Sequence, residues 1–223
     1  MKTKLVAVTQ PFVKKDGNDS TVYLTPEEFI VYIARVSNPT NQLNMETGSR
    51  LLKYLIKHKH WSPFEHVNCT FEIETSRAIA AQILRHRSFT FQEFSQRYAQ
   101  ATSFEDLEFR LQGKTNRQVG DTPVDLPGHI QESIVELQSK SQMVYNSLLD
   151  VGVAKECARM VLPLNTLTTI YMTGSLRSWL HYLDLRCSVD TQKEHRDIAL
   201  SIKNYLKDIF PDTFKSLEIE VSH

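Results

Sequence analysis

The residues from Val67 to Tyr98 constrain the fold most, because a strand pattern, a helix pattern and a cluster of cations follow one another there. Apolar and polar side chains alternate from Val67 to Thr75, which predicts a strand with one buried face. Ser76 to Leu84 has a helical pattern, and Arg85-His86-Arg87 follow at its end. The β-branched and aromatic residues from 89 to 91 then predict an extended exit. The cations therefore lie where a helix gives way to an extended segment.

Helix patterns dominate the rest of the chain. Thr25-Pro26-Glu27-Glu28 combines an N-cap hydroxyl, a proline in the first turn and a capping-box glutamate, so it predicts a helix start. A second helix is expected from Ser49 to Lys59, and a long amphipathic helix from Ile130 to Val151. A further capping box, Thr191-Gln192-Lys193-Glu194, predicts a terminal helix that ends near Phe210.

Strand patterns are fewer. Lys4 to Val8 reads as a short strand, whereas the pattern from Asn165 to Thr173 is ambiguous between helix and strand. Polar residues from Lys14 to Ser20 predict a loop, and those from Gly113 to Gly128 predict a long surface loop. A few strands among many helices, without a break in composition, predict a single α+β domain over residues 1–223.

Composition narrows the classes of function. The 223 residues include 26 Lys+Arg and 26 Asp+Glu, so the chain lacks the overall positive field of many nucleic-acid-binding proteins. Three cysteines without metal-like spacing fit a reducing cytoplasm better than a disulfide framework. No secretory signal or membrane-length apolar run is apparent, and we expect a cytoplasmic protein. Cys69 and Cys157 are expected to be small core residues, and the charge of Arg186 is expected to lower the pKa of Cys187.

The cationic stretch predicts a site for a phosphorylated, planar ligand. Guanidinium groups offer phosphate a planar fork of donors, and neighbouring aromatic side chains can stack on a ring. Arginines that merely complement a helix dipole and face solvent are the alternative. Two sets of side chains would share a direction: Gln82, Arg85 and His86 on a helix, and Glu93, Ser95 and Arg97 on an extended chain.

A second set of cations lies in the C-terminal half. Arg177 and His181 are four residues apart and share a helix face, whereas Arg186 projects from roughly the opposite side. Gly174-Ser175 at the start of this helix offers backbone N–H groups to an anion, unless it is an ordinary capped helix. Arg159 is a further isolated cation beside an apolar helix face.

Metal and covalent chemistry have weaker support. His58, His60, Glu65 and His66 form a dense cluster without ligand spacing, so no metal site is expected. Ser95 has no evident His and Asp partners for a hydrolase triad. Without a Gly-x-Gly-x-x-Gly or Walker-like loop, a dinucleotide would bind outside a Rossmann crevice. Several separate arginines and no clear nucleophile suit an enzyme whose chemistry is done by a bound cofactor.

Five blocks of sequence carry a more specific signal: Ala34-Arg35-Val36-Ser37, HWSPFEH at 60–66, QILRHRSFTFQEFSQRY at 82–98, RMVLPLN at 159–165, and residues 174–196. In this order they resemble the flavin-dependent thymidylate synthase family. The resemblance implies an α+β fold with an antiparallel sheet, and a homotetramer whose active sites lie between subunits and bind FAD. It also implies conversion of dUMP to dTMP, with 5,10-methylenetetrahydrofolate giving the carbon and NADPH reducing the flavin.

The resemblance assigns roles to individual residues. Arg186 would be catalytic, interacting with the uracil ring and favouring loss of its N3 proton. Gln92 and Gln96 depart from the family, which often has Asn and Gly at these positions. FAD would be held by Ser62, Arg85, His86, Arg87, Glu93, Ser175, Leu176, Arg177 and His181, with Ser37 and His60 as further candidates. The nucleotide would be held by Gln82, Ile83, Leu84, Arg85, Glu93, Phe94, Ser95, Gln96, Arg97, Arg159 and Arg186.

Two other functions stand beside this one. Basic residues interleaved with Phe89, Phe91, Phe94 and Tyr98 could stack bases in a nucleotide- or RNA-binding module without catalysis. The neutral net charge disfavours such a module. A metal-dependent nucleotide hydrolase would instead use His58, His60 and His66.

Overall fold

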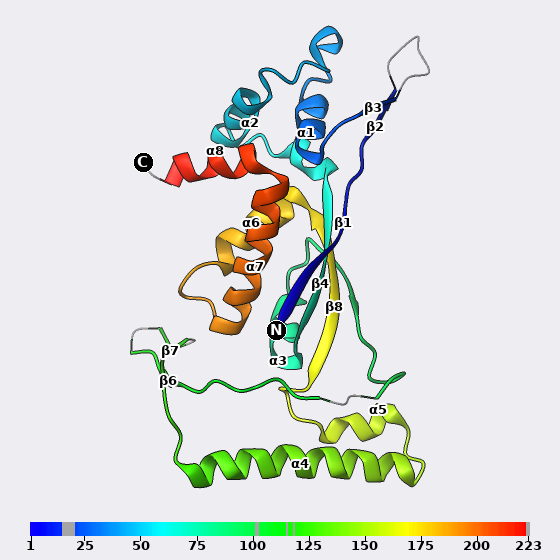
Figure 1. Ribbon diagram of the computed structural model, residues 1–223, viewed down its shortest axis with the longest axis vertical. Helices are drawn as coiled ribbons and strands as arrows, with labels where there is room; N and C mark the ends of the chain where they lie inside the picture. The colour runs from blue at the N-terminus through cyan, green and yellow to red at the C-terminus, as the bar shows by residue number, and fades with distance from the viewer. Residues whose placement is uncertain (15–20, 101–102, 115, 118, 222–223) are drawn as a thin grey trace.

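The computed structural model describes residues 1–14, 21–100, 103–114, 116–117 and 119–221, so the loop expected from Lys14 to Ser20 lies almost wholly outside the described residues. The expected α+β class is confirmed (Figure 1). The chain also forms 3-10 turns at Pro39–Asn41, Ser62–His66 and Arg159–Val161. The helices and strands are β1 (Lys2–Val8), β2 (Phe12–Lys14), β3 (Thr21–Tyr23), α1 (Pro26–Ala34), α2 (Gly48–Lys57), β4 (Asn68–Ser76), α3 (Arg77–Ile83), β5 (Thr90–Glu93), β6 (Arg110–Gln112), β7 (Gly120–Pro123), α4 (Gly128–Asp150), α5 (Lys155–Ala158), β8 (Leu167–Ser175), α6 (Leu176–Arg186), α7 (Lys193–Ile209) and α8 (Pro211–Val221).

A four-stranded antiparallel sheet, in the order β1-β4-β8-β5, forms the centre of the fold. The strand predicted from Val67 to Thr75 is confirmed as β4, whose residues Cys69, Phe71 and Ile73 are all buried. The ambiguous segment after Asn165 is strand β8, which pairs with β4 along its whole length. Burial in β8 alternates with period two, which is the signature of a strand with one face in the core.

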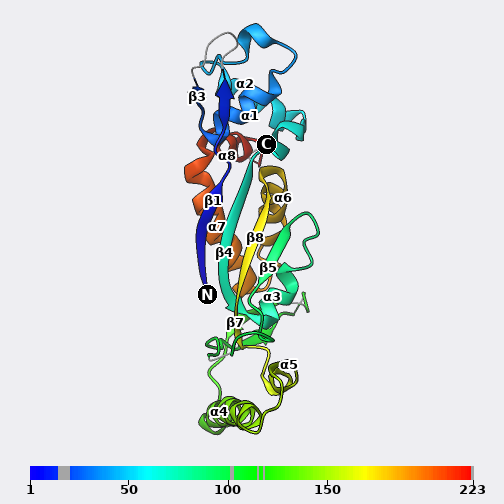
Figure 2. The ribbon, with the colours of Figure 1, turned by 90° about the vertical axis from the view of Figure 1, so that its right-hand side faces the viewer.

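Helices α6 and α7 cover one face of the sheet, and no helix of the described residues covers the other (Figure 2). Trp179 of α6 is the centre of the covered face. It is fully buried, its ring lies edge-on to Phe71 and Phe89, and its indole N–H donates to the Cys69 carbonyl over 3.2 Å. Gly174 makes room for this packing, because a Cβ atom there would clash with the Phe89 ring. The pairing of β4 with β8 therefore places the α6 start at the end of the central strands.

Helices α1, α2 and α8 lie together at one end of the sheet (Figure 1). The predicted capping box at the α1 start is confirmed, since the Thr25 hydroxyl accepts from the Glu28 N–H and the Glu28 carboxylate accepts from the Thr25 N–H. Helix α8 was not predicted. The buried carboxylate of Glu27 accepts from the backbone N–H groups of Asp212 and Thr213, so it satisfies donors in the first turn of α8. Burial raises the pKa of Glu27.

The second predicted capping box was wrong. Helix α7 begins at Lys193, and its N-cap is Gln192, which makes no side-chain capping bond. The Thr191 hydroxyl instead donates to the Leu185 carbonyl over 3.1 Å, and the Glu194 carboxylate accepts from side chains. Tertiary partners have therefore replaced the local bonds that the sequence pattern favours. The helix ends at Ile209, close to the predicted end.

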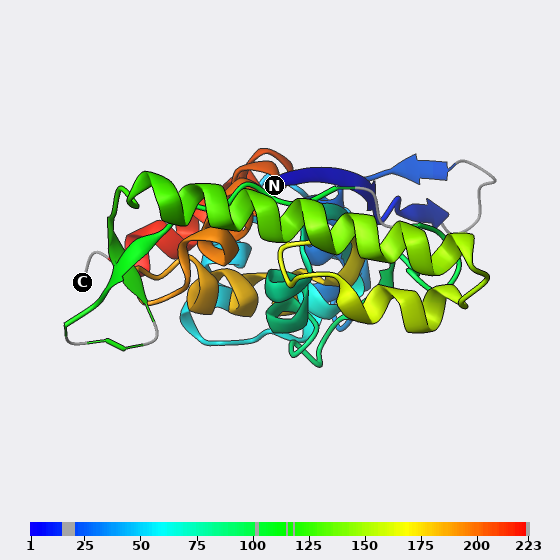
Figure 3. The ribbon, with the colours of Figure 1, turned by 90° about the horizontal axis from the view of Figure 1, so that it is seen from below.

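Helix α4 crosses the far end of the molecule, with α5 beside it (Figure 3). The predicted long helix from Ile130 to Val151 is confirmed, although among its described side chains only Tyr145 is buried. The loop predicted from Gly113 to Gly128 was partly wrong, because β7 pairs with β6 as a hairpin. None of the described helices has both the length and the apolar character needed to cross a membrane.

The cysteine predictions had mixed outcomes. Cys69 is buried in the core as expected, and burial raises its pKa to about 12. Cys157 was wrongly assigned to the core, since its side chain is exposed. The expected lowering of the Cys187 pKa was also wrong. Burial raises that pKa, and the attraction of Lys203 lowers it by less.

Candidate active site

The C-terminal end of α6 brings Arg186 against the segment that follows α3. The Arg186 Nε–H donates to His86 Nε2 over 2.9 Å. Because His86 accepts this bond, its ring is neutral at that nitrogen. Burial, and then the positive charges of Arg186 and His181, lower the pKa of His86 to about 4. Among the described residues the two Nη groups of Arg186 have no hydrogen-bond partner, so they remain available while its Nε is held.

Gln82 joins the same cluster from the last turn of α3. Its Nε2–H donates to Gln192 Oε1 over 2.7 Å, and its Oε1 lies 3.4 Å from His195 Nδ1. His195 is completely buried, and burial, followed by the charges of Arg186 and His86, lowers its pKa to about 3. Neither Gln192 nor His195 was among the predicted site residues. The two follow the predicted start of α7, and sequence spacing could not show that this start faces α3.

The predicted shared face of Gln82, Arg85 and His86 is only partly present. Helix α3 ends at Ile83, so Arg85 and His86 lie beyond its last turn. Gln82 and His86 both face the junction of α6 and α7, whereas Arg85 is exposed. Arg85 and Arg87 make no ion pair within the described residues, and both guanidinium groups therefore remain available for an anion.

The predicted extended rib of Glu93, Ser95 and Arg97 was wrong. Strand β5 ends at Glu93, and a turn follows in which the Tyr98 and Ala99 N–H groups donate to the Ser95 carbonyl. Glu93 is held separately, because its Oε1 accepts from Thr168 over 3.0 Å and lies 3.4 Å from Arg77 Nη1. The alternation of strand side chains therefore stops before Ser95.

The turn after β5 packs beside α5. Arg97 Nε lies 3.4 Å from Glu156 Oε2, and the Arg159 Nε–H donates to the Glu156 carbonyl over 3.3 Å. Lys155 Nζ donates to the Tyr98 carbonyl over 3.2 Å. A hollow of about 400 Å³ lies here, lined by Ser95, Arg97, Tyr98, Ala154, Lys155 and Glu156. The structure thus brings Arg97 and Arg159, predicted to hold the nucleotide, to one residue, with Arg97 at the carboxylate of Glu156 and Arg159 at its backbone carbonyl.

Gln96 lies in this turn, at one of the two departures from the family pattern. Its side chain is 2% exposed, and its Nε2 has no hydrogen-bond partner among the described residues. A buried amide N–H without an acceptor is costly, so it marks a position that a ligand or a further chain could satisfy. Phe94, two residues earlier, is 38% exposed.

The start of α6 forms the third part of the candidate site. Ser175 is the N-cap, accepting from the Ser178 N–H, and its hydroxyl donates to Glu65 Oε2 over 2.7 Å. Arg177 Nη1 donates to Glu65 Oε1 over 2.7 Å. The Ser175 bond, and then the bond and charge of Arg177, outweigh partial burial and lower the pKa of Glu65. Ser62, in a 3-10 turn that contacts α6, and His181 of α6 are both exposed, whereas Leu176 is fully buried.

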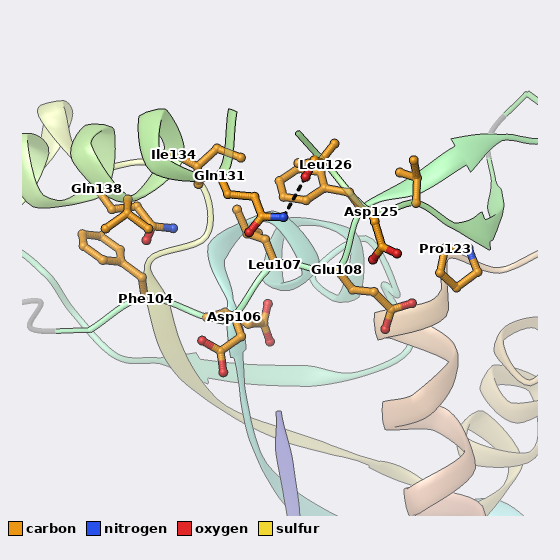
Figure 4. Close-up of a pocket in the computed structure, with 14 residues that line it drawn as sticks. Phe104, Asp106, Leu107, Glu108, Pro123, Asp125, Leu126, Gln131, Ile134 and Gln138 are labelled. Carbon is orange, nitrogen blue, oxygen red and sulfur yellow. Dashed lines mark hydrogen bonds between the residues drawn. The ribbon is translucent and has the colours of Figure 1, made fainter. Parts of the chain in front are cut away.

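Two other features of the structure lie away from these cationic side chains. His58 and His60 form an exposed ring cluster with Tyr54, and among the described residues no group of three or more His, Cys, Asp and Glu side chains is placed to hold a metal. A hollow of about 500 Å³ lies between α4 and the segment 104–109 (Figure 4). Its lining includes four carboxylates, which disfavour an anionic ligand: Glu105, Asp106, Glu108 and Asp125.

The fold and the site together define an α+β protein with several cations arranged for anionic ligands at the ends of its central strands. The sequence pattern of the Thy1 family, "Thymidylate synthase complementing protein", matches residues 21–212. The chain therefore belongs to this family, and the resemblance stated from the sequence is confirmed.

Individual relatives and one solved structure agree with this assignment. A probable flavin-dependent thymidylate synthase of Paramecium bursaria Chlorella virus 1 is 48% identical over 221 residues, covering 98% of this chain and 99% of the relative. A flavin-dependent thymidylate synthase of Synechocystis sp. is 46% identical over 220 residues, covering 98% and 100%. The crystal structure of a UMP/dUMP methylase, PolB, from Streptomyces cacaoi with bound 5-Br dUMP superposes with a TM-score of 0.79 at 25% identity, covering 98% of this chain and 94% of that one.

Proposed function

We propose that this protein is a flavin-dependent thymidylate synthase that converts dUMP to dTMP. In this reaction 5,10-methylenetetrahydrofolate gives the carbon, and NADPH reduces the bound FAD. The observation that carries the proposal is the contact of Arg186 with His86, because it joins two predicted site residues from distant parts of a chain of this family. The relatives' names and the dUMP analogue in the solved structure support the same substrate.

The residues predicted to hold FAD suit an anionic cofactor. Arg85 and Arg87 are exposed beyond α3 without an ion pair among the described residues, and Ser175 and Arg177 stand at the start of α6. Helix starts and guanidinium groups are both typical phosphate-binding groups. Glu65 holds Ser175 and Arg177 in one arrangement, and an incoming phosphate would compete with this carboxylate for Arg177. The flavin, when bound, supplies the hydride.

Arg186 is suited to ionise a uracil ring. A guanidinium stays positively charged at all ordinary pH values, so it can stabilise the negative charge that develops when N3 loses its proton. The neutral ring of His86 holds Arg186 Nε without adding a second positive charge. The remaining Nη groups form a fork of donors that matches a carbonyl and an adjacent anionic nitrogen.

Arg97 and Arg159 are placed to hold the nucleotide phosphate. Both already gather at Glu156, Arg97 through its carboxylate and Arg159 through its carbonyl. A phosphate dianion in the hollow beside Ser95 would be a stronger partner for Arg97 than one partly exposed carboxylate. We therefore propose that phosphate binding exchanges the partner of Arg97.

We propose a homotetramer with active sites between subunits. Helix α4 exposes Val135, Leu137 and Met143, which are between 50% and 64% exposed, and none of the described helices covers the sheet face opposite α6 (Figure 2). Such surfaces are typical of chains that associate. Within each chain we propose one domain over residues 1–223, since the core forms one continuous cluster. The free cysteines fit a reducing cytoplasm, where we propose that the protein works.

The visible absorption spectrum of the purified protein, before and after adding dUMP, tests the proposal. We expect an oxidised-flavin spectrum that dUMP perturbs, and dTMP formation with the folate and NADPH. Arg186→Ala should keep the flavin and the fold but lose dTMP formation, whereas Lys207→Ala, which removes a partly exposed cation paired with Glu218, should match the wild type. A colourless protein that takes up no added FAD would refute the proposal and favour a nucleotide- or RNA-binding module.

A further inference from the structure

A row of hydrogen bonds connects the β6–β7 hairpin with α3. Arg110 Nη2 lies 2.5 Å from Glu194 Oε1, and Gln192 Nε2 lies 2.9 Å from Glu194 Oε2. Gln82 Nε2 lies 2.7 Å from Gln192 Oε1, and His195 Nδ1 lies 3.4 Å from Gln82 Oε1. One end of the row is an ion pair, and the other end is a completely buried imidazole.

The ion pair determines the direction of every bond in the row. Burial would raise the pKa of Glu194, but the bonds from Arg110, from its own backbone N–H and from Gln192 outweigh burial and lower it, so the carboxylate is ionised and can only accept. Gln192 must therefore turn its N–H groups to Glu194 and its oxygen to Gln82. Gln82 must then turn an N–H to Gln192 and its oxygen to His195, whose Nδ1 must carry the proton. A flipped amide anywhere in the row would set two acceptors against each other.

His195 donates this hydrogen bond from a neutral ring that is held in place. The ring is completely buried, 5.8 Å from the Tyr182 ring and 6.1 Å from the His86 ring. Arg186 and His86 are the charged or titratable groups that further disfavour its protonation. With the proton on Nδ1, the Nε2 atom carries a lone pair, and it has no hydrogen-bond partner among the described residues.

We propose that His195 is a positioning residue that orients the Gln82 amide to select uracil over cytosine. The inference rests on the proposed function, in which Gln82 contacts dUMP. One N–H of this amide is bound to Gln192, and the second, which has no partner in the described part of the chain, remains for a ligand. A carbonyl of uracil accepts from that N–H. Cytosine presents an amino group at position 4, so two donors would face each other and the site would leave both unpaired.

The test compares dUMP and dCMP as ligands of the intact, flavin-loaded protein. The dissociation constants are read from the change in flavin absorption, with melting temperature and flavin content measured in parallel. Asparagine carries its N–H close to the position of His Nδ1, whereas glutamine carries it close to Nε2. We expect His195→Asn to keep the wild-type preference for dUMP within about twofold, and His195→Gln to lower it by about tenfold, which corresponds to about 1.4 kcal/mol. Equal preference in wild type and His195→Gln, or equal loss in both variants, would overturn the inference.

A second variant leaves the buried ring untouched. Gln192→Leu removes the acceptor that holds the Gln82 N–H, at a half-buried position at the start of α7. It should also lower the preference for dUMP by about tenfold, and an unchanged preference would contradict the proposal even if both His195 variants failed to fold. A flavin-loaded wild type that neither responds to dUMP nor forms dTMP would instead overturn the proposed function, and this inference with it.

Discussion

Acidification from pH 7 to pH 5 should destabilise this protein through two buried histidines. Burial and neighbouring positive charge lower the pKa of His195 to about 3 and that of His86 to about 4, whereas both titrate near 6.5 in the unfolded chain. At pH values between the folded and the unfolded pKa of each histidine, the unfolded state binds more protons than the folded state. Stability therefore rises with pH across this window and is lost as the pH falls below about 6.5.

The size of the effect follows from the proton uptake of the unfolded chain. A histidine that stays neutral in the folded state but has an ordinary pKa when unfolded loses ~2 kcal/mol of stability between pH 7 and pH 5. This value applies to His195, which is completely buried. His86 is only half-buried, so solvent screening reduces its share to ~1 kcal/mol. The expected total is ~3 kcal/mol, a large part of the stability of an ordinary domain.

Urea unfolding at a series of pH values, at one protein concentration and one flavin content, measures this loss. His195→Asn removes the titrating group and should reduce the loss by ~2 kcal/mol, whereas His129→Asn, on the exposed side of α4, should leave it intact. The raised pKa of Glu27 acts with the opposite sign, but it is common to all variants and cancels in the comparison. A free energy of unfolding that falls equally in wild type and His195→Asn would refute the reasoning.

Three further changes test the packing, a helix cap and the phosphate site. Gly174→Ala places a Cβ against the Phe89 ring and should cost ~1–3 kcal/mol, seen as a lower melting temperature; an unchanged value would contradict the close contact. Thr25→Ala removes the α1 cap and should cost ~1 kcal/mol in urea unfolding, while Thr25→Ser should cost much less. Arg97→Ala should weaken dUMP binding by about tenfold or more in a flavin-absorption titration, because charge-assisted bonds are lost. The melting temperature of Arg97→Ala should hardly change, because the ion pair of Arg97 with Glu156 is exposed. Normal dUMP affinity in this variant would exclude Arg97 from the site.

Elements whose signals are local could be predicted from the sequence alone. The alternation that became β4, the Thr25 capping box and the long helix α4 are all properties of neighbouring residues, so periodicity and capping chemistry predict them directly. The ordered blocks of motifs also sufficed to identify the family. Helix α8 escaped prediction, because a distant carboxylate, that of Glu27, binds donors in its first turn.

The way in which the site residues meet depends on contacts between distant segments. Thr191 and Glu194 have the pattern of a capping box, yet contacts with Leu185 and Arg110 take up their side chains, because bonds between distant segments replaced the local ones. His195 carries no signal in sequence, since a histidine four residues into a predicted helix start is equally compatible with solvent. Only the packing of α7 against α3 and α6 buries it, keeps it neutral and places its proton at Gln82. Burial and long-range contact set the ionisation and direction of these groups, and neither property belongs to a residue before the chain folds.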